Sequence, residues 1–292
     1  MNPATAIFEA ERPRLTALCY RMLGERAAAE DAVQDTWLRW SGIDPDAIDN
    51  AAAWLRRTAT NIAIDALRSA RSKREAYPGP WLPEPLFPDA LQDVGARFEI
   101  AQECELALLW AMERLSASER AAFILREAFD AGYDEIALTL GKSPAACRQL
   151  VSRAHRRLQE SGPRFDAPDN EVRELIASFL SAVARADFDT ATRLLAPDAV
   201  AISDGGRKAR AALRPLIGAQ DILTVFASVM RKSGAEADWR LDVVKVNGAP
   251  ALVRWLDGRV DLVLTVAPDA TGRIAWFYMM RNPDKLPGAS YQ

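Results

Sequence analysis

The stretch Tyr133–Leu158, YDEIALTLGKSPAACRQLVSRAHRRL, predicts two short helices that meet across a tight turn. Gly141 can adopt the left-handed conformation that ends a helix. Ser143 offers an N-cap hydroxyl, and Pro144 suits the first helical position because no amide donor is needed there. Apolar residues at helical spacing form one face of the first half: Ile136, Ala137 and Leu140. The pattern predicts a helix-turn-helix.

The second predicted helix is basic and contains no acidic residue. Its buried face holds apolar residues at helical spacing: Ala146, Cys147, Leu150, Val151, Ala154 and Leu158. Its outward face holds small, amide and guanidinium side chains: Ala145, Arg148, Gln149, Ser152 and Arg156. Such a face suits a DNA major groove, with Lys142, Arg153 and Arg157 as candidate phosphate contacts. An ordinary helical hairpin with a solvated basic face is the alternative that these residues leave open.

The overall charge argues against a uniformly basic surface, but positive charge is concentrated locally. The 292 residues carry a net charge of −3. Residues 141–159 nevertheless contain five Lys or Arg and no acid, and residues 56–74 contain six against the single Asp65. A local basic patch is what groove binding requires.

Composition also limits the chemistry that the chain can perform. The three cysteines, Cys19, Cys104 and Cys147, lie far apart, which favours reduced thiols in a cytoplasmic protein. His155 is the only histidine, so we expect neither a histidine-rich metal site nor a Ser-His-Asp triad, and no cofactor. No apolar run approaches the length of a membrane span.

Two helices are predicted near the N-terminus, over residues 14–23 and then up to Trp40. The second places Glu30, Asp31, Gln34 and Asp35 on one face. Such a face is usually just solvated, but it can also dock a basic partner.

A loop over residues 41–51 leads into a third helix, from Ala52 to about Ser72. Basic and amide side chains line that helix: Arg56, Arg57, Asn61, Asp65, Arg68 and Arg71. A loop followed by such a helix is used in recognition of single-stranded DNA, where cations follow the backbone and a pocket takes an unstacked base. A surface helix beside a linker is the simpler alternative.

Residues 77–88 contain five prolines and predict a semi-rigid connector. Its apolar residues need a covering surface: Trp81, Leu82, Leu86 and Phe87. A helix is expected over residues 97–115, and Ser116 with Glu119 fits a capping box that opens the next helix. Beyond Pro163, an amphipathic helix over 171–186 and a short helix near Leu194 are followed by alternating segments. These predict antiparallel strands at 239–246, 251–256, 260–266 and 274–280, and thus an α+β domain with a concave sheet.

Taken together, these segments resemble the extracytoplasmic-function (ECF) sigma factors of bacterial RNA polymerase, in particular the SigJ-like branch with a C-terminal SnoaL-like domain. Residues 30–40, EDAVQDTWLRW, resemble the polymerase-clamp helix of the family. Residues 54–68 resemble its promoter-melting and minus-ten-reading helix, and residues 116–158 its minus-thirty-five-reading domain. Three motifs resemble the branch itself: Trp81-Leu82-Pro83-Glu84-Pro85, Asp204-Gly205-Gly206-Arg207-Lys208 and Asn282-Pro283-Asp284-Lys285-Leu286.

The resemblance implies a multidomain fold: an all-α sigma domain 2 at 1–75, a proline-rich linker at 76–98, an all-α sigma domain 4 at 99–162 and an α+β SnoaL/NTF2-like cone domain at 168–292. It implies contacts with core RNA polymerase, through the beta-prime clamp and beta flap, and with promoter DNA, without a membrane partner. The implied polymerase-binding residues are Glu30, Asp31, Gln34, Asp35 and Leu38. The implied minus-ten residues are Arg56, Arg57, Asn61, Asp65 and Arg68. The implied minus-thirty-five residues are Lys142, Ser143, Ala145, Arg148, Gln149, Ser152, Arg153 and Arg156.

The three branch motifs imply a regulatory contact between the linker and the C-terminal domain. Its residues are Trp81, Leu82, Pro83, Glu84, Pro85, Asp204, Gly205, Gly206, Lys208, Asn282, Pro283, Asp284, Lys285 and Leu286. The branch usually has a third glycine where this chain has Arg207, so the backbone there has lost conformational freedom.

Two other functions remain open at this stage. SnoaL-like domains resemble small-molecule cyclases and isomerases, so the C-terminal domain could bind a small molecule or catalyse a reaction, although it has no histidine to serve as acid or base. We expect a regulatory module instead, and no enzyme. The other alternative, an ordinary two-site repressor, is disfavoured by the acidic helix and the linker.

Overall fold

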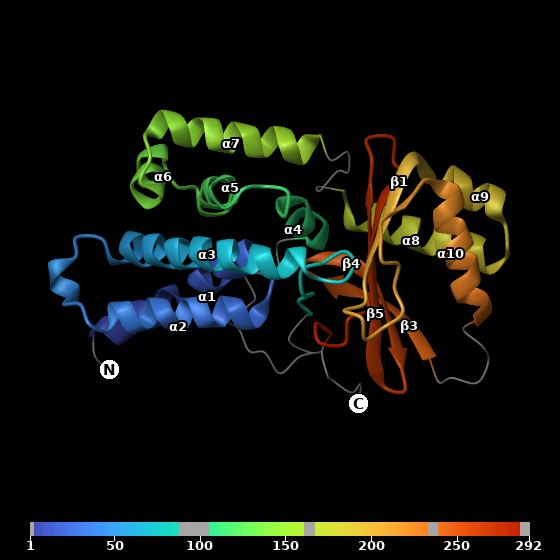
Figure 1. Ribbon diagram of the computed structural model, residues 1–292, viewed down its shortest axis with the longest axis horizontal. Helices are drawn as coiled ribbons and strands as arrows, with labels where there is room; N and C mark the ends of the chain where they lie inside the picture. The colour runs from blue at the N-terminus through green and yellow to red at the C-terminus, as the bar shows by residue number, and fades with distance from the viewer. Residues whose placement is uncertain (1–2, 88–104, 161–166, 233–238, 287–292) are drawn as a thin grey trace. The chain divides into compact units, whose positions relative to one another are not determined.

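The computed structural model describes residues 3–87, 105–160, 167–232 and 239–286, and these form two compact units. The first unit is helical and contains residues 3–76 and 109–160. The second contains the linker residues 77–87, residues 105–108, and the α+β part from residue 167 onward. Figure 1 shows the helices of the first unit in blue to green, the helices of the second unit in yellow to orange, and the sheet mainly in orange and red.

Three helices begin the first unit: α1 (Pro3–Leu23), α2 (Arg26–Trp40) and α3 (Ala51–Glu75). They pack on one another around buried side chains such as Leu15 and Trp40. The indole nitrogen of Trp40 donates to the carbonyl of Ala4 over 2.8 Å. Helix α1 begins at Pro3, well before the predicted start at Arg14. The prediction began too late because Pro13 breaks the sequence pattern, although it does not end the helix.

The predicted helix-turn-helix is confirmed. Helix α5 (Ala117–Phe129) opens with the predicted capping box of Ser116 and Glu119. Helices α6 (Tyr133–Leu140) and α7 (Pro144–Gln159) follow, with Gly141 left-handed at φ 63° and the Ser143 hydroxyl capping the amide of Ala146. The helix expected over 97–115 is shorter where it can be seen: α4 covers Leu106–Met112, the chain then turns, and residues 97–104 lie outside the described residues.

The second unit packs helices on a six-stranded sheet. Its helices are α8 (Asp169–Ala184), α9 (Phe188–Arg193) and α10 (Ala219–Lys232). The strands are β1 (Leu195–Asp204), β2 (Leu216–Ile217), β3 (Trp239–Val246), β4 (Ala249–Leu256), β5 (Arg259–Pro268) and β6 (Ile274–Met280), in the spatial order β2-β1-β6-β5-β4-β3. Phe179 of α8, Phe226 of α10 and Phe277 of β6 form an aromatic cluster between helices and sheet, with ring centroids 4.8–5.3 Å apart.

The four predicted strands are confirmed, and the sheet is larger than the sequence indicated. The four predicted strands pair antiparallel as expected, whereas the unpredicted strand β1 pairs in parallel with β6. Strand β1 was missed because Pro197 and Asp198 interrupt its alternation, and helix α10 was not predicted at all. In the described ranges no helix has both the length and the apolar character needed to span a bilayer.

Candidate nucleic-acid interface and linker clamp

Helix α7 presents the outward face that its sequence predicts. The side chains proposed to reach DNA are exposed: Lys142, Ser143, Ala145, Arg148, Gln149, Ser152 and Arg156. The opposite stripe, Cys147, Leu150, Val151, Ala154 and Leu158, is buried. The guanidinium of Arg148 lies 5.1 Å from the ring centroid of Tyr133, a cation–π contact that restrains its direction. Burial raises the pKa of the Cys147 thiol, so this cysteine serves the core.

Two of the arginines predicted to reach phosphates have partners within the domain. Arg153 Nε lies 3.0 Å from one carboxylate oxygen of Glu119, and Arg157 Nη1 lies 2.7 Å from the other. Burial opposes the charge of Glu119, but hydrogen bonds from Ser116 and the two arginines outweigh burial and lower the pKa of this carboxyl. Both arginines remain more than two-fifths exposed, so each can hold α7 on α5 and still face an anionic ligand.

Helix α3 has the basic face proposed for the minus-ten element. Arg57, Asp65 and Arg68 are exposed, and Asn61 is half-buried. Arg56 differs, because its Nη2 donates to Glu135 of α6 over 2.7 Å and its side chain is only 19% exposed.

A second contact likewise joins the helices that precede the linker to those that follow it. Arg120 of α5 is buried and donates to the carbonyl of Arg21 on α1 over 3.0 Å, and it also pairs with Glu113. The predicted sigma domains 2 and 4 therefore contact each other within this unit, through α3 with α6 and α1 with α5.

The face of α2 proposed to bind polymerase is open to solvent. Glu30, Asp31, Gln34 and Asp35 are exposed, and Leu38 among them is 59% exposed. This face therefore offers negative charge and one large apolar side chain to a partner.

The linker is held in the second unit by the buried carboxylate of Asp204, at the end of β1. This residue has no exposed surface. Its two oxygens accept hydrogen bonds from the Tyr77 hydroxyl over 2.6 Å and the Leu82 amide over 3.0 Å. They also accept from the Gly206 amide over 3.1 Å and the Lys285 ammonium over 2.8 Å. Burial raises the pKa of the Tyr77 hydroxyl, and its hydrogen bond to Asp204 raises it further.

Lys285 and Asn282 complete this arrangement from the chain segment after β6. The Lys285 ammonium also donates to the carbonyl of Leu82 over 2.7 Å and lies 4.2 Å from the ring centroid of Trp81. Asn282 is buried and donates to the Tyr77 hydroxyl over 2.9 Å.

Two glycines in the Asp204–Lys208 loop allow this close packing. Gly206 has φ +57°, and a Cβ there would lie 2.4 Å from the Asn282 side chain. A Cβ on Gly205 would lie 2.3 Å from the carbonyl of Ala209. Arg207 also adopts a positive φ, 60°, which is unfavourable for a residue with a side chain.

A further anchor, which the sequence analysis missed, is Asn247 in the turn between β3 and β4. Its side-chain oxygen accepts a hydrogen bond from the Leu86 backbone amide over 2.8 Å, and its backbone amide donates to the Leu86 carbonyl over 2.8 Å. We call the contacts of residues 77–87 with Asp204, Asn247, Asn282 and Lys285 the linker clamp. The dipeptide Asn247-Gly248 is a hairpin signal, but nothing local in it indicates a distant partner.

The predicted contact residues divide into two groups. Leu82, Pro83, Glu84, Pro85 and Leu286 are buried, as Asp204, Asn282 and Lys285 are, and Trp81 is half-buried. Lys208, Pro283 and Asp284 are exposed, and Lys208 pairs with Asp284 over 2.7 Å. The second group therefore lies at the margin of the linker clamp.

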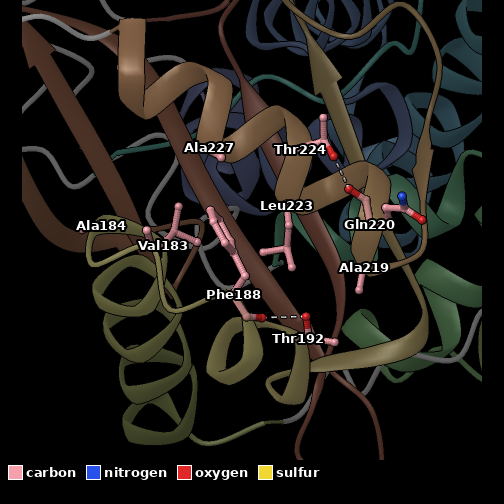
Figure 2. A pocket seen from close by; sticks show the side chains of 10 residues that line it. Val183, Ala184, Phe188, Thr192, Ala219, Gln220, Leu223, Thr224 and Ala227 are labelled. Carbon is pink, nitrogen blue, oxygen red and sulfur yellow. Dashed lines mark hydrogen bonds between the residues drawn. The ribbon is translucent and has the colours of Figure 1, made fainter.

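The C-terminal unit also contains two hollows. The larger, about 930 Å³, lies between helices α8, α9 and α10 and is lined by small and apolar side chains such as Phe188 and Leu223 (Figure 2). Its two threonine hydroxyls, on Thr192 and Thr224, donate to carbonyls of their own helices. The smaller hollow, about 100 Å³, lies between α10 and the sheet and is lined partly by arginines. No group of residues suited to hold a metal ion occurs in the described parts of the chain.

Comparison with known proteins agrees with this architecture. A family model described as Sigma-70 region 2 matches residues 7–73, and one described as Sigma-70, region 4 matches residues 99–158. The ECF RNA polymerase sigma factor SigJ of Mycobacterium tuberculosis is 34% identical, over 97% of this chain and 93% of its own length. The ECF RNA polymerase sigma factor SigG of the same organism is 30% identical, over 92% and 79%.

The helical domains, the helix-turn-helix and these matches define a sigma factor of RNA polymerase. More narrowly, the chain belongs to the ECF RNA polymerase sigma factors. Its fold is similar to the crystal structure of the M. tuberculosis SigJ protein, with a TM-score of 0.72, 31% identity and coverage of 96% of this chain and 97% of that one. The similarity extends over the α+β unit, whose helices and six-stranded sheet agree with the α+β domain expected after the sigma domains.

Proposed function

We propose that this protein binds core RNA polymerase in the cytoplasm, directs it to specific promoters, and is restrained by its own C-terminal domain. The exposed acidic face of α2, with Leu38 at its C-terminal end, would dock on the basic clamp of the beta-prime subunit, and domain 4 on the beta flap. The charge of that face and the exposure of Leu38 support this assignment.

Helix α7 would read the minus-thirty-five element in the major groove. Arg148 and Gln149 lie near its N-terminal end, where a recognition helix meets base edges, and each can form two hydrogen bonds to one base. Lys142, Ser143, Ala145, Ser152, Arg153 and Arg156 would surround them. Helix α3 would act at the minus-ten element, with Asn61 and Asp65 affecting promoter opening and Arg57 and Arg68 following the DNA backbone.

The linker clamp supports the proposed restraint of the sigma domains. The main observation behind it is the buried carboxylate of Asp204, which holds the linker. Domains 2 and 4 must separate to reach two promoter elements, but in this structure α3 is paired to α6 through Arg56 and Glu135, and the connecting linker is held by the C-terminal unit. Core polymerase would favour an open form by binding it more tightly, which shifts the population from closed to open.

We propose that the C-terminal domain acts without catalysis. Asp261, whose carboxylate lies beside the smaller pocket, is engaged by Arg254 over 2.6 Å and by Arg281 over 3.0 Å, and no histidine is present in the domain to serve as acid or base. Because its oxygens are occupied by two guanidinium groups, this carboxylate is not free to take a proton from a substrate.

Run-off transcription with purified core RNA polymerase tests this function. The full-length protein should direct initiation at a fixed start site and co-purify with core polymerase, and reversal of charge at Glu30, Asp31 and Asp35 should remove both properties. The matched control reverses Glu160 and Asp257, which are exposed and belong to other elements than α2. A protein that binds promoter DNA but neither co-purifies with polymerase nor initiates transcription would be a repressor, and the proposal would fail.

A further inference from the structure

The smaller pocket of the C-terminal unit combines an apolar interior with guanidinium groups. It measures about 100 Å³ and lies between helix α10 and the sheet. Apolar side chains from both elements line it: Leu216, Val225, Phe226, Val229, Leu262, Leu264 and Met279. The charged residues of the lining are Arg210, Arg254 and Arg281, and Ser203, Ala211 and Ala212 complete it. Val229 and Arg210 are exposed, so the pocket opens to solvent beside them.

An irregularity in the pairing of β4 with β5 positions the charged residues at the polar end of the pocket. Between β4 and β5 the register shifts after Arg254, which leaves Asp261 unpaired in the ladder. Asp261 then receives Nε and Nη2 of Arg254 at 2.7 and 2.6 Å and Nη2 of Arg281 at 3.0 Å. The remaining Nη1 of Arg281 donates to the carbonyl of Arg210 over 2.8 Å.

This polar end has an excess of positive charge and an unused donor. Three arginines line the pocket and one carboxylate, Asp261, lies beside it, which leaves a formal charge of +2. The buried Nε of Arg281 has no acceptor among the residues that the structure describes. Buried donors are normally paired, so an unpaired one beside a cavity indicates an acceptor that arrives from outside the chain.

We propose that this pocket binds a small monocarboxylate, with the carboxylate at Arg254 and Arg281 and an apolar body in the interior. Guanidinium groups match carboxylates geometrically. A closed cavity of about 150 Å³ holds benzene; this pocket is smaller but opens to solvent, so it takes a short branched chain, or a single ring that extends into its mouth. The larger hollow of Figure 2 has apolar walls without a charged group, so it lacks the polar end that would orient such a ligand.

The pocket shares its structural elements with the linker clamp, and this part of the inference rests on the proposed function. Ser203 lines the pocket while the next residue, Asp204, holds the linker. In the same way Arg281 lines the pocket while Asn282 contacts Tyr77, and the Arg281 amide donates to the Asp204 carbonyl over 2.7 Å. Ser203 and Asp204 are neighbours in β1 and point to opposite faces, and Arg281 and Asn282 directly follow β6, so the adjacent ends of these two strands serve both sites. A ligand that fits the pocket of the clamped structure stabilises that structure and acts as a corepressor.

Binding is tested by calorimetry on the full-length protein with benzoate and 3-methylbutanoate, and with benzamide as the neutral counterpart of benzoate. Binding of a carboxylate, at least tenfold tighter than that of benzamide, is expected. Arg254→Gln should abolish it, and so should Val229→Trp, which blocks the mouth at an exposed position and keeps every charge. Arg240→Gln, on β3 and paired with Asp242 outside the pocket, is the control and should bind as the parent does. The proposal is overturned if neither acid binds, or if both pocket variants bind as tightly as the parent.

Hydrogen exchange at the Leu82 amide tests the corepressor role and the linker clamp separately. At a carboxylate concentration ten times the dissociation constant, that amide should exchange about elevenfold more slowly. An unchanged rate despite binding refutes the corepressor role. Without ligand, Asp204→Asn should accelerate the same exchange, and an equal rate in this variant and the parent refutes the clamp itself.

Discussion

Helix α7 and the linker owe their order to opposite causes. Helix α7 has its own cap, its own apolar stripe and an exposed outer face, so its structure follows from adjacent residues. Residues 77–87 form neither helix nor strand, yet Leu82, Leu86 and Phe87 are at most 3% exposed. Their partners lie far away in the sequence, at Asp204, Asn247, Asn282 and Lys285. A substitution on the outer face of α7 should therefore change DNA reading alone, whereas a substitution in the clamp should change stability and regulation.

The largest effect is expected for Asp204→Ala. The substitution leaves the ammonium of Lys285 buried without its carboxylate and the Leu82 amide without its acceptor. Removal of one partner of a buried ion pair costs about 3–5 kcal/mol, which urea denaturation of the full-length protein would measure. Asp284→Ala is the control, because its pair with Lys208 is 58% exposed on both sides and should contribute less than about 1 kcal/mol. Equal losses in the two variants would contradict the central place of Asp204.

Phe87→Ala should cost about 3 kcal/mol of unfolding free energy, since Phe87 is 1% exposed and its removal leaves a cavity. Leu213→Ala, at a side chain that is 73% exposed in the same unit, should change stability by less than about 0.5 kcal/mol. A Phe87 variant as stable as the Leu213 variant would show that the linker end is not held in solution.

Arg148→Ala and Gln149→Ala should each weaken promoter binding by about 1–3 kcal/mol at one base position and leave thermal stability unchanged. Binding assays on a set of promoters with single-base changes measure this. Gln159→Ala, exposed at the far end of α7, is the control. Uniform weakening on all promoter sequences would instead assign Arg148 and Gln149 to phosphate contacts.

A smaller effect concerns acid stability of the helix-turn-helix. Because the folded pKa of Glu119 is lowered from 4.5, its carboxylate stabilises the fold at neutral pH, and that stabilisation is lost as the pH falls through the lowered folded pKa. Glu119→Gln should be less stable at neutral pH and should lose less stability on acidification. Denaturation midpoints across this range measure the difference, with the exposed Glu160→Gln as control. Parallel pH profiles for the parent and Glu119→Gln would contradict this account.

The smallest effect is expected for Arg207→Gly. Arg207 has φ 60°, and glycine relieves the strain of that conformation, so the clamp unit should gain up to about 1 kcal/mol. Thermal unfolding of the full-length protein measures it. A loss of stability would show that the Arg207 side chain makes contacts that outweigh its backbone strain.

The sequence predicts well what is locally encoded. The capping box at Ser116, the left-handed Gly141 and the Ser143 cap follow from neighbouring residues and are all confirmed. Strand β1 escaped prediction because its order comes from pairing with β6, which is distant in the sequence. Tyr77 and Asn247 escaped for the same reason, since their roles depend on partners more than a hundred residues away. Asp204 was proposed as a contact from the family resemblance, whereas its complete burial and its four hydrogen bonds emerge only from the fold.

The most direct test of the clamp replaces Trp81 and Leu82 with Ser and compares this variant with the parent in two assays. One is small-angle scattering of the free protein, and the other is run-off transcription with core RNA polymerase. If the linker clamp restrains the sigma domains, the variant has a larger radius of gyration and produces more transcript at equal protein concentration. A variant that is as compact as the parent and transcribes at the same rate would contradict the claim that the C-terminal domain regulates this sigma factor through its linker.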